Sequence, residues 1–279
     1  MSERAVLVTG SSSGIGLASV EELVRHGFIV YAVVRGQVDA QRLRALDERV
    51  RPLVFDVTDG PAIAAAATQV RAEGLPLHGV VANAGVALGG PLEYLPLDQI
   101  RRLFEVNVFG ALAVAQAFLP ALRETRGRLV FVGSISGRIA FPFTAPYSAS
   151  KFALRAFADA LRIELRPAGI GVSLIEPGSV KTPIWEKGRA SRRALEDALP
   201  AIARERYGPQ LAQLFTMIEA EERGGMPVER VSAAILHALT APKPRAKYLL
   251  GSSARVASVL AVLPDPLRER AVRAAVKAP

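Results

Sequence analysis

Tyr147 and Lys151 are the two residues of this 279-residue sequence whose types and spacing most directly suggest chemistry. Residues at positions i and i+4 share one face of a helix, and Pro146 suits the first turn of such a helix. Free tyrosine, with a pKa of ~10, is a poor base at neutral pH. An ammonium about 4 Å away, at an effective dielectric constant of ~20, would attract the phenolate by about 4 kcal/mol and lower that pKa by roughly three units. The pair therefore predicts general acid–base catalysis, although an exposed, unrelated tyrosine and lysine would show the same spacing.

A glycine-rich run over Thr9–Gly16 is the second feature that suggests chemistry. Its glycines allow a tight turn and a close approach of the backbone to a phosphate. The helix that follows would present free N–H groups and the positive end of its dipole to that phosphate. The spacing is G-x-x-x-G-x-G, which differs from the general dinucleotide pattern G-x-G-x-x-G. An ordinary strand-to-helix loop is the alternative, but the position of the run favours a phosphate-binding turn.

The elements that must position these residues are short apolar runs alternating with longer helical patterns. The apolar runs show little alternation, which is typical of a parallel sheet covered by helices on both faces. We therefore expect an α/β fold, a Rossmann-type doubly wound parallel sheet of about seven strands. Gly27 follows the first expected helix where a left-handed C-cap residue would lie. Strands are expected at Ala5–Thr9, Phe28–Val34, Pro52–Asp56, Gly79–Asn83, Arg128–Ser134, Gly171–Glu176 and Ala246–Leu250, and helices at Gly14–His26, Leu97–Thr125 and Ser148–Arg166.

We expect a single domain over residues 1–279, since the sequence shows no linker and no internal repeat. Residues 183–226 interrupt the strand–helix alternation with a charged, helix-prone segment. This segment follows the carboxyl end of a strand, where ligands bind in open α/β sheets, so it is expected to form a lid over the site. Residues 254–279 form a C-terminal extension with two helical patterns, separated by Pro264-Asp265-Pro266.

Composition excludes several classes of site. The chain has no cysteine, which rules out disulfides, thiolate metal sites and cysteine nucleophiles. His26, His78 and His237 lack metal-ligand spacing, so no metal is expected. The net charge is +9, but the arginines are spread along the chain without interleaved aromatic residues. This pattern favours solvated basic faces over a nucleic-acid-binding surface.

The cellular location is judged from the N-terminus and from apolar runs. The N-terminus lacks the features of a signal peptide. No apolar run approaches the roughly 20 residues of a membrane span, because Gln116 and Pro120 interrupt the longest one, Ala111–Leu122. We expect a soluble cytoplasmic protein. The last helix carries Arg268, Arg270, Arg273 and Lys277, which could contact an anionic membrane, but an interface or a solvated helix is the reading we favour.

The motifs, taken in order, resemble the short-chain dehydrogenase/reductase family, whose signature is T-G-x-x-x-G-x-G. The resemblance covers residues 5 to about 182, and the stretch Val172–Thr182 with Arg35 is similar to the hydroxysteroid and retinol dehydrogenase branches. The further matching positions are Asp56 after the third strand, Asn83-Ala84-Gly85 after the fourth, Asn107 within a helix, Ser134 after the fifth strand, the Y-x-x-x-K of Tyr147 and Lys151, and Pro177-Gly178 with Thr182.

The resemblance implies an oxidoreductase that interconverts a secondary alcohol and a ketone by hydride transfer. Tyr147 would be the general acid/base, Ser134 would bind the substrate oxygen, and Lys151 would also contact the cofactor ribose. Asn107 would hold a water that links Lys151 to solvent, or would serve helix-bend packing. Thr182 would bind the nicotinamide carboxamide, cap the helix before Pro183, or both. The implied catalytic residues are Asn107, Ser134, Tyr147 and Lys151; the implied cofactor-binding residues are Gly10, Ser12, Ser13, Gly14, Ile15, Gly16, Arg35, Asp56, Val57, Asn83, Ala84, Gly85, Tyr147, Lys151, Pro177, Gly178, Val180 and Thr182.

The end of the second strand bears on the choice of cofactor. Val34 stands where NAD-preferring members of the family carry an acid, and Arg35 follows it. A guanidinium is a good partner for a 2′-phosphate, so NADP(H) is expected, with NAD(H) possible. Arg35 stacked on the adenine would serve either cofactor. Ser13 is neutral where some NADP-preferring members have a base.

The expected substrate is apolar, because apolar residues flank the site between Ser134 and Tyr147 and recur in the lid. Ordinary packing is the alternative reading of those residues. A homodimer or homotetramer through the helices at Leu97–Thr125 and Ser148–Arg166 is implied by the family. A non-catalytic cofactor-binding regulator on the same fold is the rival function, but such proteins usually lose the tyrosine or the lysine. The apolar residues are Ile139, Phe141 and Phe143 beside the site, and Ile184, Trp185, Tyr207, Phe215 and Met217 in the lid.

Overall fold

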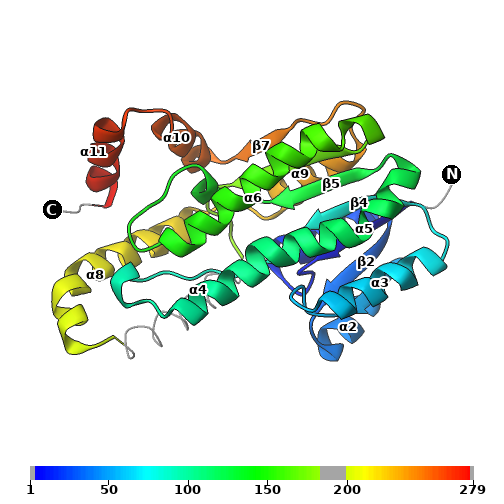
Figure 1. The fold of residues 1–279 in the computed structure, drawn as a ribbon, viewed down its shortest axis with the longest axis horizontal. Helices are drawn as coiled ribbons and strands as arrows, with labels where there is room; N and C mark the ends of the chain where they lie inside the picture. The colour runs from blue at the N-terminus through cyan, green and yellow to red at the C-terminus, as the bar shows by residue number, and fades with distance from the viewer. Residues whose placement is uncertain (1–3, 183–198, 277–279) are drawn as a thin grey trace.

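The computed structural model describes residues 4–182 and 199–276 and is built around a parallel sheet of seven strands in the order β3-β2-β1-β4-β5-β6-β7 (Figure 1). Every pairing between neighbouring strands is parallel. The expected doubly wound α/β architecture is thereby confirmed. The strands are β1 (Ala5–Thr9), β2 (Ile29–Val34), β3 (Val50–Val54), β4 (Leu77–Ala82), β5 (Arg128–Val132), β6 (Gly171–Pro177) and β7 (Lys247–Leu250).

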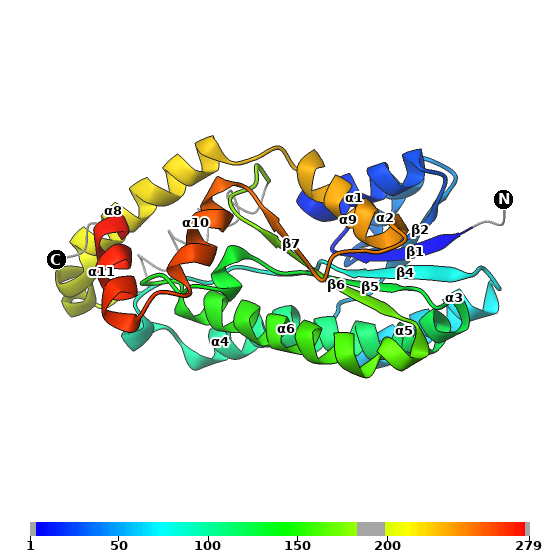
Figure 2. The same cartoon turned by 90° about the horizontal axis from the view of Figure 1, so that it is seen from above.

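Helices cover both faces of the sheet (Figure 2). On one face lie α1 (Gly14–Arg25), α2 (Gln37–Arg44) and α9 (Glu229–Thr240), and on the other lie α3 (Gly60–Ala72), α5 (Ala111–Thr125) and α6 (Ala145–Glu164). The strands alternate between the two cores: Val6 and Val8 pack under α1 and α9, whereas Ala5 and Leu7 pack toward α3 and α5. Both faces are therefore apolar, which explains why these strands are continuous apolar runs. The remaining described helices are α4 (Leu97–Phe104), α8 (Ala201–Gly224), α10 (Ser252–Leu260) and α11 (Asp265–Val276), with short turns η1 (Leu92–Tyr94), η3 (Ile135–Gly137) and η4 (Arg166–Ala168) and the π-helical turn η2 (Glu105–Gly110).

The chain reverses its direction of travel across the sheet at β1, which has β2 on one side and β4 on the other. Ligand crevices of open α/β sheets lie at this point, outside the carboxyl ends of the strands. The Thr9 hydroxyl joins the two strand ends there by accepting hydrogen bonds from the backbone N–H groups of Asn83 and Ala84, both at 3.0 Å. The Asn83 amide returns a hydrogen bond to the Thr9 carbonyl at 2.9 Å.

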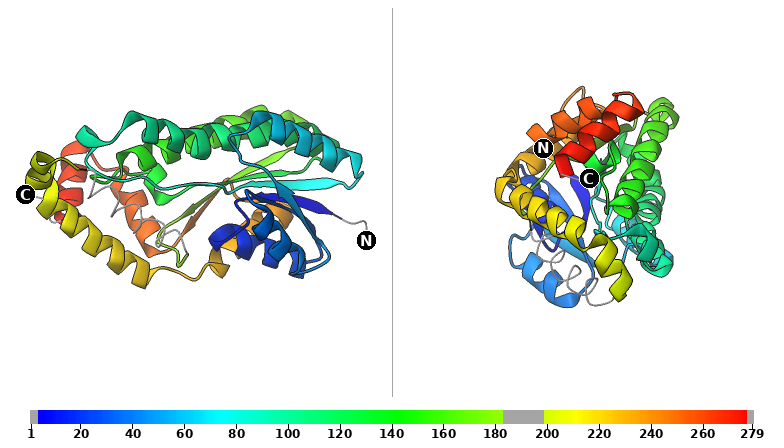
Figure 3. Two further views of the ribbon diagram at one scale, coloured as in Figure 1. Left: turned by 90° about the horizontal axis from the view of Figure 1, so that it is seen from below. Right: turned by 90° about the vertical axis from the view of Figure 1, so that its left-hand side faces the viewer.

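The helices α8, α10 and α11 lie beyond the carboxyl ends of the strands (Figures 2 and 3). A short parallel bridge between Val180 and Met226 joins the chain after β6 to the chain after α8. The expected lid is thus described only from Leu199 onward, and residues 183–198, with Ile184 and Trp185, lie outside the described residues. The two helices expected in the C-terminal extension are present as α10 and α11.

Within the described ranges, the helical stretch Leu97–Thr125 is long and apolar enough to cross a membrane, judged by length and composition alone. The sequence-based expectation of no such run was wrong by this measure. The stretch is nevertheless a core helix, since its α5 residues Val114, Phe118 and Leu122 are fully buried against the sheet. A buried core helix of a globular protein satisfies the same criteria.

The Thr9 hydroxyl provides a test of how the strand ends are held together. Thr9→Val removes the acceptor and leaves two backbone N–H groups without it, so the free energy of unfolding is expected to fall by about 2–4 kcal/mol in urea denaturation. Thr9→Ser keeps the hydroxyl and is the matched control, with a smaller loss expected. Equal losses in the two variants would contradict a role for the hydrogen bonds.

Candidate active site

Lys151 is the buried centre of the candidate site, with 5% of its surface exposed. It lies one turn after Tyr147 in α6, which begins with Pro146 in its first turn as expected. The Lys151 ammonium donates a hydrogen bond to the carbonyl of Val132, the last residue of β5, at 3.0 Å. This bond fixes the start of α6 against the end of β5, and Ser134 follows Val132 by two residues.

Ser134 is the N-cap residue of the turn η3, and the hydrogen-bonding influence of its side chain on the Tyr147 phenol acts to lower the pKa of that phenol. Its hydroxyl oxygen also accepts a hydrogen bond from the backbone N–H of Ser136 at 3.1 Å. Gly137 packs against the backbone of α6, because a Cβ at this position would lie 2.8 Å from the Lys151 carbonyl oxygen. The turn and the helix thus approach closely, and the fold brings together three of the four expected catalytic residues.

The pKa of Tyr147 is shifted in the direction opposite to the sequence-based prediction. Burial raises the pKa of the Tyr147 phenol, and the hydrogen bond with Ser134 lowers it by less. Burial also lowers the pKa of Lys151 to about 8. The Lys151 nitrogen lies 5.7 Å from the centre of the Tyr147 ring. The predicted three-unit decrease counted only the attraction of a nearby ammonium, whereas loss of solvent disfavours the charged form of each group.

Asn107, the fourth expected catalytic residue, lies in the π-helical turn η2 between α4 and α5. Its side chain is buried and bonds the backbone of Val86 in both senses, accepting from the N–H at 2.8 Å and donating to the carbonyl at 2.9 Å. It also donates to the Ser150 hydroxyl at 3.1 Å. The amide thus holds the loop after β4 against α6, which agrees with the packing alternative, while the water-holding role stays a prediction.

The turn after β1 fits a nucleotide phosphate. Gly10 and Gly14 have φ values of +68° and +55°, which favour glycine. A Cβ at Gly16 would lie 2.1 Å from the Gly10 carbonyl oxygen, so only glycine fits there. In the described part of the chain, Ser13 makes no capping hydrogen bond to α1 and the first turn of α1 has no acid. The N–H groups of this helix end are therefore available to an anion.

The remaining expected cofactor residues line the same edge of the sheet. Arg35 is exposed directly after β2. Burial alone would raise the pKa of Asp56, but hydrogen bonds from Thr58 and the charges of Arg35 and Arg102 hold it below its ordinary value. The other positions are the buried Val57 and Val180, Asn83-Ala84-Gly85 after β4, Pro177-Gly178 at the end of β6, and the half-buried Thr182.

Sequence reasoning missed three residues that hold this edge in place. Thr9 joins β1 to β4, as described above. Arg42 of α2 donates a hydrogen bond to the Ser12 carbonyl in the glycine-rich turn, and Arg138 bonds the buried Glu176. Each pair joins residues far apart in the sequence. In the sequence, only the order of the matched motifs indicated this edge of the sheet, and that order does not identify the hydrogen-bond partners of these three residues.

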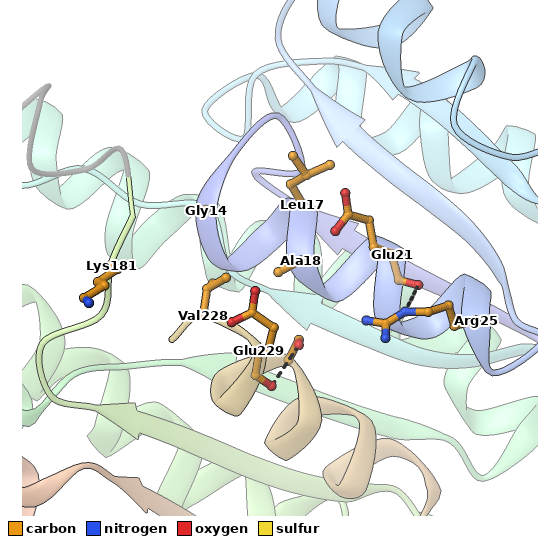
Figure 4. Close-up of a pocket in the computed structure, with 9 residues that line it drawn as sticks. Gly14, Leu17, Ala18, Glu21, Arg25, Lys181, Val228 and Glu229 are labelled. Carbon is orange, nitrogen blue, oxygen red and sulfur yellow. Dashed lines mark hydrogen bonds between the residues drawn. The ribbon is translucent and has the colours of Figure 1, made fainter. Parts of the chain in front are cut away.

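A cavity of about 280 Å³ lies between α1 and α9 (Figure 4). Gly14 of the phosphate-binding turn and Lys181 of the chain after β6 both contribute to its lining. Glu21 and Glu229 lie on opposite sides of it, on α1 and α9. The cavity therefore adjoins the expected cofactor site rather than the catalytic residues.

Aromatic side chains gather where the described part of the expected lid packs against η1 and against the chain before α6. The Tyr207 ring of α8 lies edge-on to Phe143 and Tyr94, with ring centres 6.0 and 6.2 Å apart. The Tyr207 hydroxyl donates a hydrogen bond to Glu93 at 2.7 Å. Phe215 is buried in the same cluster. Of the other expected pocket residues, Ile139 is buried, and Phe141 and Met217 are half-buried.

The histidines make separate contacts. His237 bonds the Tyr248 hydroxyl at 2.8 Å, His26 faces the Glu22 carbonyl at 2.8 Å, and His78 faces the Pro76 carbonyl at 3.2 Å. Within residues 4–182 and 199–276, His, Asp and Glu side chains form no group of three that could hold a metal ion.

Comparison with known proteins agrees with this geometry. Residues 4–193 match the model of the family described as short chain dehydrogenase. The chain is 36% identical over 257 residues to an NADPH-dependent 3-dehydrocapnine reductase from Ornithobacterium rhinotracheale, covering 88% of each chain.

Two solved structures share the fold. The structure of a short-chain dehydrogenase from Streptomyces avermitilis aligns with a TM-score of 0.79 and 28% identity, over 97% of this chain and 95% of that one. A short-chain dehydrogenase/reductase from Burkholderia phymatum, in complex with NAD, aligns with a TM-score of 0.77 and 27% identity over 92% of each chain.

The buried Lys151 predicts a pH dependence of stability. Its pKa is about 8 in the folded protein against 10.5 for an ordinary lysine, so the unfolded chain binds more protons between these values and folding becomes more favourable as pH rises through them. Relative to Lys151→Met, the wild-type free energy of unfolding is expected to increase by up to about 3 kcal/mol between about pH 7.5 and about pH 10.5, as measured in denaturant titrations. A difference that stays constant with pH would show that Lys151 titrates normally.

Proposed function

We propose that this chain, which belongs to the short-chain dehydrogenase/reductase family of oxidoreductases, interconverts a lipophilic secondary alcohol and a ketone with NADP(H). The single observation that carries the reaction type is the junction of Ser134, Tyr147 and Lys151, where β5 ends and α6 begins. When bound, the nicotinamide cofactor supplies the hydride to the carbonyl carbon or accepts it from the alcohol.

The raised pKa of Tyr147 suits the direction of ketone reduction. A phenol that keeps its proton at neutral pH can donate it to the substrate oxygen as negative charge develops there. The Ser134 hydroxyl can donate a second hydrogen bond to that oxygen. Lys151, with a pKa of about 8, is mostly charged at neutral pH and stabilises the phenolate left behind. Alcohol oxidation would run these steps in reverse.

The proposal of NADP(H) is supported by positive charge on the ribose side of the phosphate-binding turn. Arg35 is exposed after the buried Val34, and Arg42 bonds the Ser12 carbonyl nearby. Guanidinium groups bind phosphate through charge-assisted hydrogen bonds. The similar dehydrocapnine reductase is named as NADPH-dependent, whereas the Burkholderia phymatum structure holds NAD, so NAD(H) remains a second cofactor to assay.

The proposal of a lipophilic substrate is supported by the apolar cluster that contains Tyr94, Phe143, Tyr207 and Phe215. Phe143 lies in the chain shortly before Tyr147. Apolar walls favour apolar ligands. A non-catalytic regulator is not favoured, because the fold keeps Ser134 and Tyr147 together with the buried Lys151 at one junction.

We also propose a cytoplasmic homodimer or homotetramer that associates through the surface of α4, η2 and α6. Large apolar side chains are exposed there: Leu97 by 64%, Phe109 by 53%, Phe152 by 42% and Ile163 by 76%. Exposed apolar side chains on neighbouring elements can together form an interaction surface.

The reaction is tested by Tyr147→Phe. Purified protein is assayed by nicotinamide absorbance at about 340 nm, with ketones and secondary alcohols ranging from small to steroid-sized and with both reduced and both oxidised cofactors. Wild-type protein is expected to turn over the larger apolar ketones with NADPH. The variant is expected to lose turnover, because it lacks the transferable proton, while its NADPH affinity stays within about twofold. Substantial residual turnover in the variant would refute the role of Tyr147.

Cofactor choice is tested by Arg35→Ala. The dissociation constant for NADPH is expected to rise about 10-fold or more, because a charge-assisted bond to the 2′-phosphate is lost, with little change for NADH. Arg44→Ala, which removes an exposed charge from the same region of α2, is the matched control. Titration with each cofactor, followed by quenching of protein fluorescence or by cofactor fluorescence, gives the dissociation constants for NADPH and NADH. Equal weakening of NADH and NADPH would indicate that Arg35 stacks on the adenine.

A further inference from the structure

Arg138 and Glu176 form a buried ion pair that the proposed reaction does not itself use. Glu176 has no exposed surface, and the Arg138 side chain is 14% exposed. The guanidinium binds both carboxylate oxygens, through Nε at 2.9 Å and Nη2 at 2.5 Å. Its Nη1 donates to the Ser258 hydroxyl of α10 at 3.0 Å. The guanidinium therefore connects the chain after β5, the end of β6 and the C-terminal extension.

The backbone of Arg138 belongs to the turn that begins at Ser134. The Arg138 N–H donates to the Ile135 carbonyl at 2.8 Å, and the Gly137 N–H donates to the Ser134 carbonyl at 2.9 Å. A displacement of the Arg138 backbone would therefore also displace Ser134, because the hydrogen bonds of this short turn connect the two residues.

Glu176 is equally well placed on the other side of the pair. It lies in β6 directly before Pro177-Gly178, where cofactor contacts are expected. The Gly133 N–H, just before Ser134, donates to the Ile175 carbonyl at 2.7 Å, and the Gly178 N–H donates to the Leu250 carbonyl at 2.9 Å. The Glu176 carboxylate thus belongs to a strand end whose backbone is hydrogen-bonded to the chain after β5 on one side and to β7 on the other.

The opposite side of the Ser134 turn rests on α6. Gly137 contacts the Lys151 backbone, as described above, and the Arg155 guanidinium donates to the Gly137 carbonyl at 3.4 Å. The turn lies between α6, which carries Tyr147 and Lys151, and β6, which carries Glu176. Its position between them is set by contacts from both sides.

A buried ion pair adds little net stability over a well-packed apolar pair, because both charges lose their solvent. What a two-bond guanidinium–carboxylate pair adds is directional geometry, since two parallel hydrogen bonds fix both distance and orientation. The pair is therefore better explained by the position it enforces than by the stability it adds.

We propose that Arg138 is a positioning residue: its pair with Glu176, supported by Ser258, sets the place of the Ser134 hydroxyl relative to Tyr147. The inference rests on the proposed role of Ser134 in the reaction. It assigns to α10 a contact with the catalytic turn, which makes the C-terminal extension part of the support of the site.

The first test needs neither substrate nor cofactor. Tyrosine labelled with ¹³C at Cζ reports the hydrogen bonding of each phenol by NMR, and the Tyr147 resonance is assigned by its loss in Tyr147→Phe. Arg138→Lys cannot make the two-bond contact, so it is expected to move this resonance toward its position in Ser134→Ala. Combining Arg138→Lys with Ser134→Ala is expected to produce no further shift.

Arg162→Lys is the matched control, because Arg162 also bridges elements, bonding Asp159, the Val172 carbonyl and the Ala246 carbonyl, at the far end of β6. It is expected to leave the Tyr147 resonance in place. Glu176→Gln, which keeps the shape of the side chain, is the second variant should Arg138→Lys fail to fold, with the same expected shift. A Tyr147 resonance unmoved by the folded variant, or moved equally by Arg162→Lys, would overturn the proposal.

The second test measures kcat and KM for a ketone that the wild type reduces. Arg138→Lys is expected to lower kcat about 10- to 100-fold, as misplacement of a reacting group does, with a much smaller change in KM. In the Ser134→Ala background the same substitution is expected to change kcat by less than about twofold, because residues that act as a unit are not additive. An equal fold-change in both backgrounds would overturn the proposal. Absence of wild-type turnover would instead count against the proposed function, and the NMR result would still decide the role of Arg138.

Discussion

The site depends on one interaction, the hydrogen bond from the buried Lys151 ammonium to the last carbonyl of β5. Burial of a lysine disfavours its charged form, which is why its pKa lies near 8. The bond satisfies the ammonium and holds the start of α6 against the end of β5. Because Ser134 follows this strand end and Tyr147 lies in the first turn of this helix, the same contact brings these two side chains near each other. The buried environment that makes Lys151 unusual also keeps the proton on Tyr147.

The surrounding scaffold brings the ends of distant strands to one edge. The Thr9 hydroxyl joins β1 to β4, Asn107 holds the chain after β4 against α6, and Arg138 joins the catalytic turn to β6. Each contact is polar, buried or half-buried, and made between elements far apart in the sequence. Apolar burial explains the stability of the sheet, but these directional bonds explain why its loops meet in one arrangement.

Local pattern was enough to predict the sheet. The predicted bounds of the first strand, Ala5–Thr9, are those of β1, and Gly27 has the left-handed conformation expected after α1. The third strand was placed two residues too late, because Pro52 was taken as its beginning although it lies inside β3. Periodicity could not reveal the π-helical turn at Asn107, whose side chain bonds Val86 and Ser150, residues far from it in the sequence. The direction of the Tyr147 pKa shift also could not be predicted. The four-residue spacing identifies Lys151 as a charged partner but does not show how deeply the two groups are buried. The hydrogen-bond partners of Thr9 and Arg138 could be identified only from the folded structure.

In the proposed ketone reduction, a protonated Tyr147 phenol, supported by a buried Lys151, delivers the proton. The most direct measurement is the pH dependence of kcat/KM for NADPH-dependent reduction, which reports ionisations of the free enzyme. The value of kcat/KM is expected to be constant at lower pH and to fall as pH rises through about 8, where Lys151 loses its proton. A reduction rate that instead rises with pH through this range would show that the ionised phenol is the active form, and would contradict the account.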